Sequence, residues 1–149
     1  MNGPTRYVVD ASVGVKWILP EPGSDRACAL LAEVAAGHAH LLAPDLYAAE
    51  VANVLWQRAS LRAELTEEEA REALRALLVS LPELVPSEAL LPQALALALA
   101  FRRPVYDCLY AALAVREGCT LVTADRRLAG VLGPATARVT LLEELAAGA

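Results

Sequence analysis

Cysteine and histidine are scarce in this sequence, which contains three cysteines and two histidines among its 149 residues. The cysteines Cys28, Cys108 and Cys119 are odd in number and show no Cys-x-x-Cys spacing. Neither a disulfide framework nor a zinc ribbon is therefore supported. We interpret all three cysteines as small apolar residues that are buried in the fold.

Long apolar runs are also missing. The longest one, residues 89–101, is interrupted by Pro92 and Gln93 and falls short of the roughly 20 residues that a membrane-spanning helix needs. The first six residues carry no apolar core of the kind that signal peptides have. We therefore expect a cytoplasmic protein that does not enter a membrane.

Positive charge is in deficit, because 13 basic residues face 18 acidic residues and the net charge is −5. This balance argues against broad electrostatic adhesion to nucleic acid, but it leaves local contacts open. The pairs Arg102-Arg103 and Arg126-Arg127 lie close to acidic residues that are discussed below. We consider these four arginines as contacts for substrate phosphates, with an ordinary solvated surface as the alternative.

The composition favours one compact domain. Hydrophobic residues make up 56% of the chain and charged residues only 21%. This apolar excess suits a sheet that is covered on both faces, or an oligomer with an apolar contact. The length lies near the common size of a single domain, and no internal repeat or low-complexity linker divides the chain. We expect residues 1–149 to form one domain.

Short apolar segments alternate with helical patterns along the chain. Ser24 is a candidate helix cap, residues 66–69 form a capping box, and Gly118 is a helix stop. Strands that are separated by helices indicate an α/β protein with a parallel sheet between helical layers. The expected strands are 7–9, 40–43, 83–85, 120–123 and 138–141, and the expected helices are 12–19, 24–36, 44–58, 66–81, 92–101, 105–117, 126–132 and a short terminal helix.

Four acidic residues stand in apolar surroundings, where charge is least expected. An unpaired buried carboxylate is so unfavourable that it protonates, and few basic residues lie nearby in the sequence. A divalent cation is the simplest counter-ion. Mg²⁺ or Mn²⁺ suits an all-carboxylate set better than zinc, which favours His and Cys. The acids are Asp10 and Asp125, each following a strand, Glu50 within a helix, and Asp107 at the start of a helix.

The expected topology brings these acids together. Ligands of open parallel sheets bind outside the carboxyl ends of the strands, where Asp10 and Asp125 both lie. Asp107 can face the same edge from the first turn of its helix, and Glu50 projects from a helix that crosses nearby. We prefer Asp10 and Asp107 as direct ligands, with Glu50 and Asp125 completing the site directly or through water. A metal bound there would activate water against a phosphodiester, with the choice between one and two ions left open.

Each of these residues also has a structural explanation. Asp10 and Asp125 fit as helix N-caps, and Asp107 fits as a charge that complements a helix dipole. Glu50 fits as a solvent-facing side chain. For Asn53, on the same predicted helix as Glu50, a hydrogen bond between helices is an alternative to a supporting role in catalysis.

Four segments resemble the successive motifs of PIN-domain ribonucleases, especially the VapC toxins of bacterial VapBC toxin–antitoxin modules. The resemblance extends over nearly the whole chain, and the four acids occur in the expected order. The segments are VVDAS at 8–12, APDLYAAEVAN at 43–53, PVYDCLY at 104–110 and LVTADRR at 121–127.

The resemblance implies a fold, an activity and partners. The fold is a three-layer α/β/α sandwich with a parallel sheet of about five strands. The activity is Mg²⁺- or Mn²⁺-dependent hydrolysis of RNA, and the partners are a small antitoxin protein and a second copy of the chain. The implied metal-binding catalytic acids are Asp10, Glu50, Asp107 and Asp125, and Ser12 and Thr123 match the hydroxyl positions that assist them.

Two other classes of function remain open from the sequence. A small-molecule phosphohydrolase or phosphotransferase also places an aspartate after a strand, but the segment at residues 10–12 lacks a second aspartate and no late lysine follows a strand end. The other class is a catalytically inactive PIN-like module that binds protein. The four intact acids argue against it, whereas metal binding without turnover would favour it.

Overall fold

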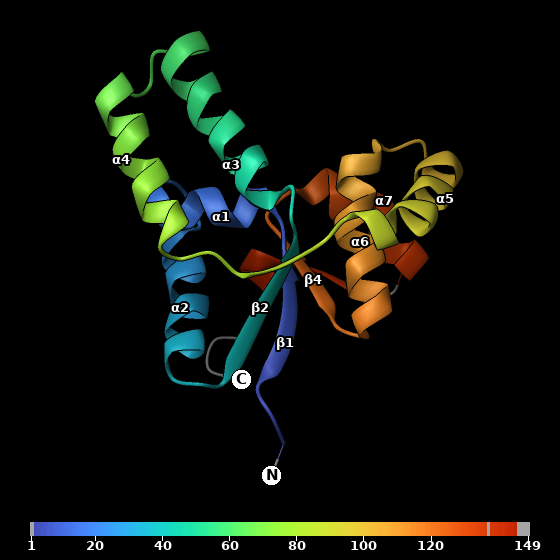
Figure 1. Ribbon diagram of the computed structural model, residues 1–149. Helices are drawn as coiled ribbons and strands as arrows, with labels where there is room; N and C mark the ends of the chain where they lie inside the picture. The colour runs from blue at the N-terminus through green and yellow to red at the C-terminus, as the bar shows by residue number, and fades with distance from the viewer. Residues whose placement is uncertain (1, 137, 146–149) are drawn as a thin grey trace.

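A single parallel sheet forms the centre of the fold (Figure 1). The computed structural model describes residues 2–136 and 138–145, and within them five strands pair in the order β3-β2-β1-β4-β5. Every neighbouring pair is parallel. The predicted α/β class is confirmed. The strands are β1 (Thr5–Val9), β2 (Ala39–Pro44), β3 (Glu83–Val85), β4 (Thr120–Thr123) and β5 (Val139–Leu141).

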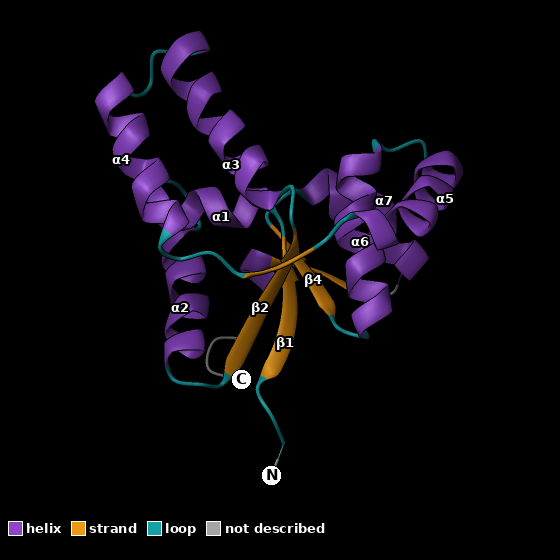
Figure 2. Cartoon of the chain, viewed as in Figure 1, coloured by secondary structure: helices purple, strands orange, loops and turns teal. Residues whose placement is uncertain are grey.

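Helices cover the sheet on both sides, as Figure 2 shows, with α1 to α4 gathered on one side and α5 to α7 on the other. Helix α2 packs against β2, while α6 packs against β1, β2 and β4. The predicted three-layer α/β/α arrangement is confirmed. The helices are α1 (Ala11–Ile18), α2 (Ser24–Ala35), α3 (Tyr47–Trp56), α4 (Glu67–Leu78), α5 (Leu91–Phe101), α6 (Val105–Glu117) and α7 (Arg126–Thr136), with short helical turns at Gln57–Leu61, Glu88–Leu90 and Leu142–Glu144.

The order of the strands reverses between β1 and β4. From β1 the chain builds outward through β2 to β3, and it then returns to place β4 and β5 on the other side of β1. The register pairs Val9 at the end of β1 with Val122, next to the end of β4. Open parallel sheets bind ligands at such a reversal, outside the carboxyl ends of the strands. The fold therefore favours a site beside these two strand ends.

The carboxyl-terminal parts of the two strands that flank this point lie in the core. Val8, Val9, Leu121 and Val122 have no exposed surface. Continuous apolar strands of this kind are typical of a parallel sheet that is covered on both faces. Residues 108–114 of α6 are also buried, and these include three alanines that let the helix approach the sheet closely. Tight packing of these elements gives the site a rigid base.

The helix ends match the sequence patterns in two of three cases. The capping box between Thr66 and Glu69 is formed, and Gly118 ends α6 with a left-handed φ of 62°. The prediction that Ser24 caps α2 is wrong, because Gly23 holds the N-cap position with a φ of 92°. The Ser24 hydroxyl instead donates to the carbonyl oxygen of Leu19 at 3.0 Å, which ties α2 back to the end of α1.

Helix α3 begins later than predicted. Pro44 completes β2, where it pairs in register with Val85, and the Asp45 backbone N–H donates to the Val85 carbonyl oxygen at 2.9 Å. These contacts extend the strand into the turn, so the helix starts only at Tyr47. The shift matters for the site because it places Glu50 in the first turn of α3.

Burial agrees with the prediction for two of the three cysteines. Cys108 and Cys119 are buried, whereas Cys28 is exposed because α2 turns only Ala27 and Leu30 fully into the core. Across residues 2–136 and 138–145, no helix combines the length and apolar character needed to span a membrane.

Candidate active site

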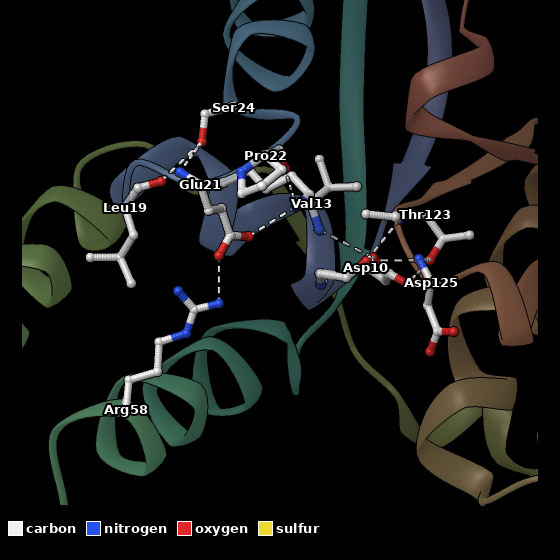
Figure 3. A network of polar contacts seen from close by, with 12 residues as sticks. Asp10, Val13, Leu19, Glu21, Pro22, Ser24, Arg58, Thr123 and Asp125 are labelled. Atoms are coloured by element: carbon white, nitrogen blue, oxygen red, sulfur yellow. Dashed lines mark hydrogen bonds and ion pairs between the residues drawn. The ribbon is translucent and has the colours of Figure 1, made fainter. Parts of the chain in front are cut away.

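Asp10 lies directly after β1, at the point where the strand order reverses, and caps the N-terminus of α1. Its side chain is 7% exposed. Oδ1 accepts hydrogen bonds from the Ser12 backbone N–H at 3.1 Å and from the Ser12 hydroxyl at 2.5 Å. Oδ2 accepts a hydrogen bond from the Thr123 hydroxyl at 2.5 Å (Figure 3). The carboxylate is therefore held from both sides.

Two hydroxyl groups connect the end of β4 to the start of α1. The fully buried Thr123 hydroxyl accepts a hydrogen bond from the Asp125 N–H at 3.0 Å. The Ser12 hydroxyl accepts one from the Ala124 N–H at 2.9 Å and lies 3.3 Å from the Thr123 hydroxyl. The structure thus brings Ser12 and Thr123 together around Asp10, as the sequence pattern predicts for supporting residues.

Burial dominates the electrostatics of Asp10. Loss of solvent raises its pKa to about 6, although the hydrogen bonds from Ser12, Thr123 and Val13 lower it, and the nearby Asp125 charge adds to the increase. Within the described ranges, no Lys or Arg forms an ion pair with this carboxylate. At neutral pH its negative charge is therefore buried and uncompensated, which makes it a strong candidate ligand for a cation.

Glu50 approaches from α3 and is held by a tyrosine. Its Oε1 accepts a hydrogen bond from the Tyr110 hydroxyl at 2.8 Å. Burial raises the pKa of Glu50, the hydrogen bond from Tyr110 lowers it, and the charges of Asp107 and Asp10 raise it further. The electrostatic influence of Asp107 and Asp10 shows that Glu50 belongs to their neighbourhood.

Asp107, in the first turn of α6, has a basic partner. The Arg103 Nη2 donates to its Oδ2 at 2.8 Å. Burial raises the pKa of Asp107, the Arg103 guanidinium lowers it, and the Asp125 charge raises it. Arg103 is thus one of the few basic residues near the acids, and only 13% of its side chain is exposed.

Asp125 is the most exposed of the four acids and caps α7. Its Oδ1 accepts hydrogen bonds from the backbone N–H groups of Arg127 at 2.9 Å and Leu128 at 3.1 Å. In Figure 3 its carboxylate points away from Asp10. Its charge nevertheless raises the pKa values of both Asp10 and Asp107. The four acids therefore form one electrostatic cluster, and the capping roles expected of Asp10 and Asp125 occur within it.

Among the described residues, the side chains of the remaining candidates form no hydrogen bond or ion pair with the four acids. Asn53 is exposed on α3, and its side chain makes no hydrogen bond to the acids in the described part of the chain. Arg126 pairs with Glu143 at 2.6 Å. Arg102 and Arg127 are exposed, and Arg102 ends α5 with a φ of 54°. A phosphate-binding role for these arginines remains a prediction.

Two tyrosines at the site escaped the sequence reasoning. The Tyr110 hydroxyl donates a hydrogen bond to Glu50. Burial, and to a smaller extent the negative charge of Asp10, raises the pKa of the fully buried Tyr47 hydroxyl. Tyr110 follows Asp107 by three residues, a spacing that puts both on the same side of a helix, and this is the signal that the sequence offers. No signal in the sequence distinguished Tyr47 from an ordinary core residue.

The donor set suits a hard divalent cation. It consists of carboxylates with supporting hydroxyl groups, and it includes the buried, uncompensated Asp10. Among the described residues, no group of three or more His, Cys, Asp or Glu side chains is arranged around one point where a metal ion could sit. Asp107 is turned to Arg103, Glu50 to Tyr110, and Asp125 to the N-terminus of α7. The residues fit the ion chemically, and binding requires these side chains to reorient.

Comparison with known proteins gives consistent matches. The sequence model of the PIN domain matches residues 7–132. Ribonuclease VapC3 of Pyrobaculum aerophilum is 42% identical over 126 residues, which cover 83% of this chain and 92% of that protein.

Two solved structures share the fold. PAE2754 from Pyrobaculum aerophilum aligns with a TM-score of 0.69 at 24% identity, covering 94% of this chain and 92% of that one. VapBC2 from Rickettsia felis, bound to a DNA fragment from its promoter, aligns with a TM-score of 0.64 at 19% identity, covering 92% of this chain and 97% of that one. At these identities the structural matches support the fold alone.

Proposed function

The chain belongs to the PIN-domain family as a VapC-type member, and from this membership we propose that it is a metal-dependent endoribonuclease acting as a toxin. The single observation that carries the proposal is the cluster of four electrostatically coupled acids around the strand reversal. The name of the relative Ribonuclease VapC3 supports RNA as the substrate. We take residues 1–149 as one PIN-like domain.

Mg²⁺ or Mn²⁺ is the proposed cofactor, as one or two ions. Asp10 and Asp107 would hold the metal directly, and Glu50 and Asp125 would complete the site directly or through water. When bound, the ion neutralises charge on the phosphate and lowers the pKa of water. The uncompensated charge of Asp10 supports this assignment, because a cation would remove the penalty of burying it.

The protein's own residues prepare the site for such chemistry. The Thr123 and Ser12 hydroxyls fix both oxygens of Asp10, so this carboxylate needs little reorganisation. The Tyr110 hydroxyl stabilises the charged form of Glu50 by donating to it. Arg103 opposes the rise that burial causes in the pKa of Asp107, and its guanidinium is suited to contact a substrate phosphate once Asp107 turns away.

A small antitoxin and a second copy of the chain are the proposed protein partners. The VapBC2 complex of Rickettsia felis supports an antitoxin partner. Exposed leucines at four-residue spacing on α5 support an apolar contact between two copies: Leu91, Leu95 and Leu99 are 44%, 51% and 74% exposed. Light scattering on the purified chain tests the dimer, and Leu95→Glu with Leu99→Glu should convert it to a monomer.

Cleavage of a mixed RNA pool tests the proposed activity. We expect cleavage with Mg²⁺ or Mn²⁺, none with EDTA, and losses of roughly a hundredfold or more in Asp10→Asn, Glu50→Gln and Asp107→Asn. Glu72→Gln, an exposed change on α4, is the control and should leave cleavage intact. Equal activity in the parent and the three site variants would remove the proposal. Metal binding without any cleavage would favour the inactive protein-binding module.

A further inference from the structure

A basic pocket adjoins the acid cluster. It encloses a cavity of about 180 Å³, and its wall contains Ala124, which lies between Thr123 and Asp125 of the candidate active site. The other walls come from α1, the start of α2, the start of α7, and the segment after β5. The pocket and the acid cluster therefore share the segment that follows β4, although none of the four acids lines the pocket.

The charge of the pocket opposes that of the whole protein. Three cationic side chains and one acidic side chain line it, whereas the chain as a whole carries a net charge of −5. This local excess of positive charge, next to a site that handles phosphates, favours an anionic ligand. The lining residues that carry the charge are Lys16, Arg26, Arg126 and Glu143.

The three cations differ in how far other groups already neutralise them. The Lys16 ammonium donates to Glu21 at 3.0 Å and to the Pro22 carbonyl oxygen at 2.7 Å, so it is part of an internal network. Arg126 pairs with Glu143, but its side chain is 75% exposed, and an exposed pair of this kind is weak.

Arg26 is the least compensated of the cations. Its Nη1 donates to the Leu145 carbonyl oxygen at 3.0 Å, and it has no carboxylate partner within residues 2–136 and 138–145. A phosphate oxygen is the preferred partner of a free guanidinium, which can bind it through two parallel hydrogen bonds.

The pocket is also partly apolar, which narrows the class of ligand. Leu141, which is half-buried, contributes carbon surface beside the cations, whereas Leu142 also lines the pocket but is only 2% exposed. A free inorganic ion gains nothing from such a wall, whereas the sugar and base of a nucleotide would pack against it. The combination therefore fits a nucleotide better than phosphate alone.

We propose that this pocket binds the nucleotide next to the cleaved phosphodiester of a single-stranded RNA. Arg26 and Arg126 contact its phosphate, and Leu141 packs against its sugar or base. The inference rests on the proposed ribonuclease function, and it adds a named subsite that sets the register of the RNA over the acids. An acidic side chain of a protein partner is the competing occupant.

RNA binding without cleavage tests the subsite. Fluorescence anisotropy with a short labelled single-stranded RNA in EDTA measures affinity over a salt series, for the parent, Arg26→Gln and Arg26→Gln/Arg126→Gln. Each lost phosphate contact should weaken binding roughly threefold to tenfold and reduce the slope of log K against log salt by about 0.7. Arg71→Gln/Arg75→Gln, on exposed residues of α4, removes the same charge elsewhere and should change neither quantity to this extent.

Competition separates a nucleotide site from a phosphate site. Nucleoside monophosphates should displace the RNA from the parent at lower concentration than inorganic phosphate does, and this difference should shrink in the Arg26→Gln/Arg126→Gln variant. Equal competition by the two ligands would overturn the nucleotide assignment. Equal RNA affinity and salt slope in the pocket variant and the α4 control would overturn the subsite, and would favour the acidic protein partner.

The outcomes that overturn the nucleotide subsite can be told apart from those that overturn the proposed ribonuclease function. If the parent cleaves RNA with Mg²⁺ and the pocket variants bind RNA like the control, the subsite is wrong and the nuclease stands. If the parent cleaves no RNA with any of the metal ions, the proposed ribonuclease function is wrong. Thermal unfolding of each variant checks folding, and both arginines are exposed, so we expect the variants to fold.

Discussion

The Arg103 guanidinium donates a hydrogen bond through Nη2 to Oδ2 of Asp107 at 2.8 Å, one helical turn away at the start of α6. Its Nε is buried and has no hydrogen-bond partner among the described residues. Arg103 is therefore held at the acid cluster mainly by its pair with Asp107. A divalent cation that binds Asp107 must compete with this internal counter-ion.

Replacing Arg103 with glutamine should tighten metal binding. The substitution removes the competing cation and leaves the Asp107 carboxylate free, so the affinity for Mn²⁺ should increase roughly threefold to tenfold, which corresponds to about 1 kcal/mol. Titration calorimetry with Mn²⁺ on the RNA-free protein measures it. Arg116→Gln, on the exposed side of α6, is the matched control. Unchanged or weaker Mn²⁺ binding in Arg103→Gln would show that the arginine does not compete with metal.

Sequence reasoning recovered the sheet because its signals are local. Residues 83–85 lie between Pro82 and Pro86, and residues 120–123 follow the helix stop Gly118; both segments are strands in the structure with the predicted limits. Helix α3 begins at Tyr47 and not at the predicted residue 44, because pairing between Pro44 and Val85 extends β2. That pairing depends on a residue 41 positions away, and it overrides the local helix signal of Asp45.

The acid cluster illustrates the same limit. Asp10 and Asp125 could be placed from sequence, because each follows a strand and parallel strands end at one edge of a sheet. The partners that orient the acids could not. The bond between Tyr110 and Glu50 depends on how α3 packs near α6, and side-chain partners of this kind are set by tertiary packing rather than by spacing along the chain.

The metal-free protein should lose stability as pH rises because of Asp10. Its pKa is raised from 3.8 to about 6 in the folded state, so its contribution to stability is present below pH 4 and is lost as pH rises through about 6. The free energy of unfolding of Asp10→Asn does not depend on this group. The difference between the variant and the parent should therefore shift in favour of the variant by roughly 2–3 kcal/mol between pH 4 and pH 7.5. Urea unfolding in EDTA across this pH range measures the difference. A gap that does not change with pH would contradict the raised pKa.

Removing the Thr123 hydroxyl should damage both stability and activity. Thr123→Val keeps the shape but leaves an Asp10 oxygen and the Asp125 N–H without their buried partner, which should cost about 1–3 kcal/mol in the free energy of unfolding. We expect RNA cleavage to fall at the same time, because Asp10 is no longer fixed. Thr123→Ser keeps the hydroxyl and should retain most of the activity. Comparable cleavage by the valine and serine variants would exclude a positioning role for this hydroxyl.

Gly14 should tolerate no side chain, because Tyr47 occupies the space beside it. A Cβ at position 14 would lie 2.2 Å from the Tyr47 hydroxyl oxygen and 2.8 Å from its Cζ, and the fully buried ring has little room to move. Gly14→Ala should therefore lower the free energy of unfolding by about 1–3 kcal/mol. Tyr47→Phe alone should cost little, since this hydroxyl has no hydrogen-bond partner in the described part of the chain. In a double-mutant cycle Tyr47→Phe removes the shortest contact and should restore part of the loss, while the ring carbons keep the rest. If the changes in the free energy of unfolding, measured by urea unfolding, are strictly additive, there is no steric conflict between a side chain at position 14 and the Tyr47 hydroxyl.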